Sequence, residues 1–233
     1  MKILKLLLMF FIIILVQPFT RADEKTTDVE LKGGTVLEET PYSKLPVIDI
    51  SANIGYGCLL SRTKGLTGEE KKMEDDLSSG LTWDFRVHSY FKSFYGFGIM
   101  YSGYHSSAKY RGADLNADIT YIAPLFCVRT NLGKTSLILK SEIGIGFLSV
   151  KEKALMSYYN PETLTGCTLG YNYTVGLEYR LSRHFGLGLD LDAVFGSIKS
   201  LKDSHGNKYE FEDDARMGIS RINIFLGLRY YIK

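Results

Sequence analysis

Residues 222 to 233 read INIFLGLRYYIK, and apolar side chains occupy every second position of this stretch. Successive side chains of a β-strand point to opposite faces, so this pattern separates an apolar row from a polar one. The apolar row holds Ile222, Ile224, Leu226, Leu228, Tyr230 and Ile232, whereas the other face includes Asn223, Gly227 and Arg229. The stretch therefore predicts a strand that separates two different environments.

The same period-two alternation recurs along the chain after residue 46, where no convincing helical periodicity is found. The alternation predicts eight strands, near residues 48–61, 80–90, 94–105, 115–130, 135–150, 166–180, 185–198 and 217–232. The links between them alternate strictly in length. Short links fall at 91–93, 131–134 and 181–184, and long polar links fall at 62–79, 106–114, 151–165 and 199–216. An up-and-down antiparallel meander gathers alternate links at opposite ends, as outer-membrane barrels do.

The direction of the two faces follows from charge and side-chain size. In the last four predicted strands the apolar row has 24 residues and no charge, although 23% of the chain is charged. The alternate row carries Lys140, Glu142, Glu178, Arg180, Asp190, Asp192, Arg221 and Arg229. An Arg or Lys facing mid-membrane lipid costs about 2–4 kcal/mol, so the uncharged row suits lipid. A soluble lipocalin-like barrel is the alternative, with the apolar row pointing inward.

Glycines favour the membrane barrel over the soluble one. They fall in the polar row, at Gly144, Gly146, Gly170, Gly176, Gly186, Gly188, Gly196 and Gly227. The interior of an eight-stranded barrel is barely wide enough for its side chains, so small residues belong there. Four strands carry Gly-x-Gly, at 55/57, 96/98, 144/146 and 186/188. None extends to a phosphate-binding G-x-G-x-x-G motif, so we interpret them as relief of crowding in the lumen.

The first 22 residues have the features of a secretory signal peptide. Lys2 and Lys5 precede an apolar run from Leu6 to Val16, and Thr20-Arg21-Ala22 supplies a small-residue cleavage site. We therefore expect a signal peptide at 1–22, a periplasmic N-terminal extension at 23–46 and the barrel at 47–233. The net charge of +2 gives no case for a nucleic-acid partner, and three scattered cysteines indicate no disulfide framework.

Together these features resemble the small bacterial outer-membrane barrels of the OmpA/OmpX and opacity-protein type. The resemblance implies an all-β fold, an eight-stranded antiparallel up-and-down transmembrane β-barrel, that is monomeric and surrounded by outer-membrane lipid and lipopolysaccharide. Gly227, Tyr230 and Ile232 are similar to the family's C-terminal Gly-x-x-aromatic-x-hydrophobic signal, which the barrel-assembly machinery reads. The chain departs from that pattern by ending on Lys233 and by lacking a final phenylalanine.

Inside such a barrel, charges of both signs are tolerable only if they are paired or hydrated. We therefore predict a charge network that fills the lumen, formed by Asp84, Arg86, Lys140, Glu142, Glu178, Arg180, Asp190, Asp192, Arg221 and Arg229. A wide aqueous pore normally needs about 16 strands. A narrow channel for small or hydrophobic solutes remains an alternative function.

The leading functional hypothesis is a structural or surface-interaction role, with four extracellular loops contacting the environment, a host or an extracellular ligand. An enzyme is the third hypothesis. His105 and Ser107 lie on one strand face, and their spacing resembles the His-x-Ser pair of outer-membrane lipid A deacylases, which implies a histidine base and a serine nucleophile. No acid partner is evident, so catalysis is not predicted. The four histidines never occur at metal-ligand spacing, and neither metal nor cofactor is predicted.

Overall fold

The computed structural model describes residues 45–60, 68–91, 94–110, 113–132, 136–155, 162–211 and 216–232. The predicted signal peptide and residues 23–44 of the predicted extension lie outside these ranges. Within them, eight long strands follow one another in antiparallel pairs. Their bounds are β1 (Ile48–Leu59), β2 (Ser79–Phe91), β3 (Tyr95–Tyr110), β4 (Ala113–Asn131), β5 (Leu137–Leu155), β6 (Glu162–Arg180), β7 (Phe185–Phe195) and β12 (Arg221–Ile232).

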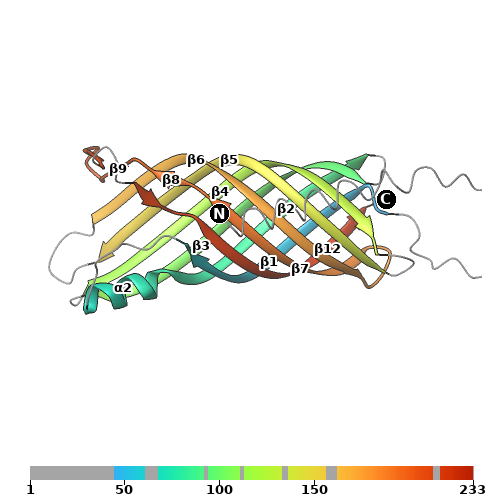
Figure 1. Cartoon of the computed structure of the whole chain (residues 1–233), viewed down its shortest axis with the longest axis horizontal. Helices are drawn as coiled ribbons and strands as arrows, with labels where there is room; N and C mark the ends of the chain where they lie inside the picture. The colour runs from blue at the N-terminus through green and yellow to red at the C-terminus, as the bar shows by residue number, and fades with distance from the viewer. Residues whose placement is uncertain are drawn as a thin grey trace, which may run out of the picture.

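The eight strands close into a barrel. Each strand pairs with its neighbours in sequence, and β12 pairs with β7 on one side and β1 on the other. The closing ladder runs from Ile48 opposite Ile232 to Leu59 opposite Arg221. Closure leaves no unpaired sheet edge in hydrocarbon, where each unsatisfied backbone group costs several kcal/mol. The predicted eight-stranded antiparallel up-and-down transmembrane barrel is confirmed (Figure 1).

The apolar row faces outward and the polar row faces the lumen. Ile145, Leu169 and Leu228 are 67%, 65% and 64% exposed, although they are large apolar residues. The lumen side instead holds fully buried arginines, lysine and carboxylates. A soluble barrel would place these two classes the other way round. The lipocalin-like alternative is therefore wrong, and the exposed apolar band is the lipid face.

Two of the predicted long loops are mostly strand. β3 continues to Tyr110 and β4 begins at Ala113, so the predicted loop at 106–114 is a paired hairpin, with Lys109 opposite Asp114. Likewise, β5 and β6 remain paired as far as Ala154 opposite Glu162. The loop prediction was wrong because it relied on polarity. Backbone pairing continues beyond the apolar band, where the outward side chains are polar and inward ones such as Ser106, Ala108 and Ala117 remain buried.

The other two long links contain further elements. A helix, α2 (Glu69–Leu77), follows β1, and β8 (Ser197–Ile198), β9 (Ser200–Lys202), β10 (Lys208–Glu210) and β11 (Met217–Gly218) separate β7 from β12. The expectation of no helix after residue 46 was therefore wrong. The charged run that was read as loop consists mainly of residues that propagate helices well, such as Glu, Lys and Met. Among the described residues, no helix is both long and apolar enough to cross a membrane.

The two ends of the barrel differ. α2 and β9 lie at one end, here called the loop end, and the C-terminus lies at the other, the turn end (Figure 1). The lumen toward the loop end is apolar, and its core cluster includes Tyr104, Ile119, Tyr121, Leu148, Val150, Ile198 and Ile219. Tyr104 Oη donates a 2.8 Å hydrogen bond to the carbonyl oxygen of Leu77, which attaches the end of α2 to this core. Most of the buried charged residues lie in the lumen between this core and the turn end, whereas Arg221 lies beside Tyr104 and Ile119 of the core.

Candidate functional site

The lumen of the barrel contains a network of buried ion pairs. Arg86 Nη2 is 2.6 Å from Asp84 Oδ2, and Arg86 Nη1 is 2.8 Å from Glu142 Oε2. Lys140 Nζ lies between Glu142 Oε1 at 2.9 Å and Glu178 Oε1 at 2.8 Å. The network thus connects β2, β5 and β6 across the lumen. Such charges are stable out of water only because each has close partners of opposite sign.

Arg229 continues the network to the far wall of the barrel. Its Nε atom is 2.9 Å from Glu178 Oε1, and its Nη2 atom is 2.7 Å from Asp190 Oδ2. Asp192 instead accepts hydrogen bonds from Thr174 Oγ1 at 2.7 Å and Asn223 Nδ2 at 2.9 Å. β7 and β12 are therefore bound to the same polar interior as β2, β5 and β6.

The remaining predicted lumen residues, Arg221 and Arg180, are also buried. Arg221 donates to Ser102 Oγ at 2.8 Å and to the carbonyl oxygen of Ile119 at 3.3 Å. The Arg180 guanidinium lies 5.8 Å from the centre of the Tyr231 ring. All ten residues named from the sequence thus point into the lumen, and none is more than 2% exposed.

Sequence reasoning missed several residues of this interior. His88 Nδ1 is 2.6 Å from Asp49 Oδ1, and Asn53 donates to Asp84 Oδ1 at 2.5 Å. His88 continues the inward row that contains Asp84 and Arg86, so extending the period-two pattern by one step would have found it. Asp49 and Asn53 share one face of β1 in the same way.

The lumen glycines make room for these side chains. A methyl group at Gly98 would lie 2.5 Å from His88 Cδ2, and one at Gly188 would lie 2.1 Å from Arg229 Nη2. Both distances are far below van der Waals contact. Two of the Gly-x-Gly strands therefore provide space for a histidine and an arginine.

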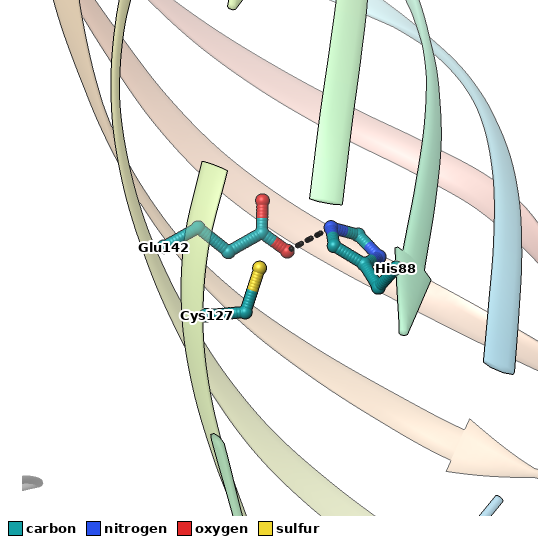
Figure 2. A group of neighbouring side chains, drawn as sticks. All are labelled: His88, Cys127 and Glu142. Carbon is teal, nitrogen blue, oxygen red and sulfur yellow. Dashed lines mark ion pairs between the residues drawn. The ribbon is translucent and has the colours of Figure 1, made fainter. Parts of the chain in front are cut away.

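Three lumen side chains form a group that combines nitrogen, sulfur and oxygen atoms, the kinds of atom that bind metal ions, unlike the surrounding ion pairs. His88 on β2, Cys127 on β4 and Glu142 on β5 each offer one donor atom, and these atoms lie within 4.8 Å of one another. Figure 2 shows the three side chains converging, with His88 Nε2 3.2 Å from Glu142 Oε1. Cys127 is fully buried, whereas Cys58 and Cys167 are exposed.

A second arrangement lies on the outer surface, near the loop end. His105 and Asp118 are directly opposite in the β3–β4 ladder, and His105 Nδ1 is 2.7 Å from Asp118 Oδ1. Ser107 is exposed on the same face, two residues along β3. The acid partner that sequence reasoning did not find is therefore present. It was missed because residues 106–114 were predicted to be a loop, which hid the register that pairs His105 with Asp118.

Aromatic residues border this outer arrangement on its membrane side. Trp83 and Tyr101 form an edge-to-face pair with ring centroids 5.3 Å apart, and both rings are exposed. The Trp83 ring covers Gly103, the outward residue that precedes His105 by two positions. Aromatic girdles mark the membrane interfaces of β-barrels. His105, Ser107 and Asp118 are thus placed at the level expected for lipid headgroups.

The residues of the predicted C-terminal signal lie on both faces of β12. Gly227 points inward against Asn53, whereas Tyr230 and Ile232 are 43% and 39% exposed on the lipid face. Tyr230 packs against Phe185 of β7, with ring centroids 5.4 Å apart. Recognition of this signal by assembly machinery remains a prediction.

The closed sheet, the outward apolar band and the charged lumen define a transmembrane β-barrel of the outer-membrane type. No family model and no curated protein matches the chain. Solved structures of outer-membrane proteins do match the chain. OprG from Pseudomonas aeruginosa is 12% identical with a TM-score of 0.50, and the match covers 79% of this chain and 96% of that chain. A major outer membrane protein from Thermus thermophilus is 13% identical with a TM-score of 0.51, covering 78% of this chain and 98% of that chain.

Neisserial surface protein A is also similar, at 12% identity and a TM-score of 0.49, with 79% of this chain and 97% of that chain covered. OprG and the Thermus thermophilus protein share the outer-membrane barrel fold with this chain, which agrees with the architecture expected from the sequence. At such identities the likeness shows the fold alone. Membership of the OmpA/OmpX family is not established by these matches.

Proposed function

We propose that the chain resides in a bacterial outer membrane and acts as a surface-interaction protein through its loop end. The observation that carries this proposal is the continuation of four strands, β3 to β6, beyond the apolar band. Their outer faces there are polar, with Lys109 Nζ 3.9 Å from Asp114 Oδ1 and both side chains well exposed. A paired wall of this kind is already ordered, so binding a partner there costs less conformational entropy than ordering a loop.

The lumen network supports a surface role over the narrow-channel alternative. Arg86, Lys140 and Arg229 each contact at least two carboxylates, of which at least one lies on another strand, and all three side chains are fully buried. A solute path through this region would have to separate these pairs. Leaving one buried charge without its partner costs about 3–5 kcal/mol. Planar-bilayer recordings of the purified barrel test the alternative, and steady single-channel conductance would favour the channel.

The surface role is tested by shortening the wall. Deleting residues 107–116 removes equal lengths of β3 and β4 and leaves the lower barrel pairing in place. Adherence of cells that display each protein to extracellular-matrix proteins and to cells of the same strain should fall for the shortened form. Substitution of Ser182, in a turn at the opposite end, with Gly serves as the matched control. Equal adherence by both variants and the wild type would contradict the proposal.

A second candidate function is hydrolysis of a lipid acyl ester at the membrane surface. The observation that favours it is the His105–Asp118 contact beside exposed Ser107. In this mechanism Asp118 accepts the Nδ1 proton of His105 in a hydrogen bond, and His105 Nε2 takes the Ser107 hydroxyl proton. Ser107 Oγ attacks the ester carbonyl, the sugar hydroxyl leaves with the proton from His105, and water then releases the fatty acid.

This second function is tested in cells by the mass of lipid A. Expression of the wild-type chain should release an acyl chain from lipid A, and the Ser107→Ala variant should not. The control is Lys109→Ala, on the same face of β3 but outside the proposed group. Lipid A of unchanged mass with the wild-type protein would exclude this activity toward lipid A.

A further inference from the structure

Three donor atoms of different chemistry converge near the turn end of the lumen. His88, Cys127 and Glu142 supply an imidazole nitrogen, a thiol sulfur and a carboxylate oxygen, all fully buried. They come from β2, β4 and β5, with β3 between the first two strands. Gly98 of β3 lies under the His88 ring and allows it to reach toward the other two residues. The barrel wall therefore brings together ligands that are far apart in sequence.

The orientation of His88 is already set by a carboxylate. Its Nδ1 atom contacts Asp49 Oδ1 at 2.6 Å, which leaves Nε2 directed at Glu142 and Cys127 (Figure 2). Within the described residues, neither His88 Nε2 nor Glu142 Oε1 makes a well-aligned hydrogen bond, although both are buried. A histidine that binds a metal through one nitrogen usually donates the other N–H to a carboxylate. Asp49 and His88 have this arrangement.

The buried charges around the donor atoms balance one another. Among the described residues, six carboxylates and six cationic side chains of the lumen are at most 2% exposed, namely Asp49, Asp84, Glu142, Glu178, Asp190, Asp192, Arg86, Arg129, Lys140, Arg180, Arg221 and Arg229. His88 lies between two of these carboxylates, with Asp49 at one ring nitrogen and Glu142 at the other. A divalent ion that takes the place of a proton on His88 Nε2 and of the Cys127 thiol proton would leave the total buried charge unchanged. Buried charges are stable when they are compensated in this way.

We propose that His88 Nε2, Cys127 Sγ and Glu142 Oε1 form a binding site for a borderline divalent metal ion of the Zn²⁺ class. A mixed nitrogen, sulfur and oxygen ligand set suits Zn²⁺ and its spectroscopic substitute Co²⁺. On binding, the Cys127 thiol releases its proton to solvent and a water molecule completes the coordination. Lys140 already lies 2.8 Å from Glu178 Oε1, so it keeps a partner when the metal takes Glu142 Oε1. The ion would tie β2, β4 and β5 together.

The test uses Co²⁺ and Zn²⁺ added to the folded, metal-free barrel in detergent. Wild-type protein should bind one Co²⁺ ion per chain and show a thiolate-to-cobalt charge-transfer absorption. Zn²⁺ should displace the Co²⁺ ion and remove this absorption. Cys127→Ser should abolish the absorption and lower Zn²⁺ affinity more than 100-fold. Asp49→Asn, which removes only the orienting carboxylate, should lower affinity by about 10–100-fold.

Two further variants make the test specific. Cys58→Ser and Cys167→Ser change exposed cysteines and should leave both the absorption and the affinity unaltered. Cys127→Ala removes the thiol without adding a polar group to the lumen. For every variant, heat-modifiable migration on a gel shows that the barrel is folded. Absence of a charge-transfer band in the folded wild-type barrel would overturn the proposal. So would a band that persists in Cys127→Ala and disappears in Cys58→Ser or Cys167→Ser.

Discussion

Asp118 lies opposite His105 on the outer face of the barrel, with its Oδ1 atom 2.7 Å from His105 Nδ1. In the proposed hydrolase this carboxylate fixes the histidine tautomer that has a free Nε2 base. Replacing Asp118 with Asn keeps the shape but favours the wrong tautomer. Where a serine, histidine and aspartate act together, the equivalent change lowers kcat by about 10⁴-fold.

The measurement for this prediction is the rate of fatty-acid release from lipid A vesicles by purified barrel. Asp118→Asn should lose activity to a similar extent as Ser107→Ala. Asp114→Asn, at the tip of the same hairpin, should keep full activity. If Asp118→Asn retained the wild-type rate, Asp118 would have no orienting role, and the second candidate function would lose its main support.

The register that places Asp118 opposite His105 shows what the sequence could and could not predict. Period-two alternation predicted eight strands, their inward and outward faces and the buried charges. It could do so because lipid requires an uncharged side chain at every outward position. Above the lipid no such requirement exists, so the ends of β3, β4, β5 and β6 were misplaced. Asp118 was missed for that reason. The cluster of His88 and Cys127 was missed because residues 39 positions apart meet only through the register of β2, β3 and β4 in the curved barrel wall.

Removing a cation from the lumen should destabilise the barrel strongly. Arg86 contacts Asp84 at 2.6 Å and Glu142 at 2.8 Å, and all three side chains are fully buried. Arg86→Ala would leave Asp84, Glu142 and Asp190 each with one cationic partner fewer, so the free energy of unfolding should fall by about 3–5 kcal/mol. Urea unfolding in lipid vesicles measures the change. Lys109→Ala, which breaks a well-exposed pair with Asp114, is the control and should cost less than about 1 kcal/mol.

Gly188 should not tolerate a side chain. A methyl group there would lie 2.1 Å from Arg229 Nη2, and Arg229 is held between Glu178 and Asp190. Gly188→Ala should therefore lower the free energy of unfolding by about 1–3 kcal/mol, the usual cost of overpacking. The control is Ala52→Val, which adds volume on the exposed outer face of β1. Equal stability of the two variants would show that the lumen can rearrange around the added methyl group.

One hydrogen bond between α2 and the barrel core can be removed with little change in packing. Tyr104 Oη donates to the carbonyl oxygen of Leu77 at 2.8 Å. Tyr104→Phe should increase hydrogen exchange across Glu69–Leu77, with a loss of about 0.5–1.5 kcal/mol in local stability. Exchange in β1 should not change. Unaltered exchange in α2 would mean that the helix is held by its apolar contacts alone.

The assignment of the outer face to lipid predicts that the cost of an outward-facing arginine depends strongly on its depth along the barrel wall. Leu226 is 61% exposed near the middle of the strand, whereas Thr163 is an outward residue of the polar wall on β6. Arg at mid-bilayer costs about 2–4 kcal/mol, and the cost falls to about 0–1 kcal/mol near the interface. Leu226→Arg should therefore destabilise the barrel in lipid vesicles by the larger amount, while Thr163→Arg should have little effect. In a soluble barrel both substitutions would add an arginine to a water-exposed surface and cost equally little, so equal stabilities would contradict the lipid assignment on which the proposed location rests.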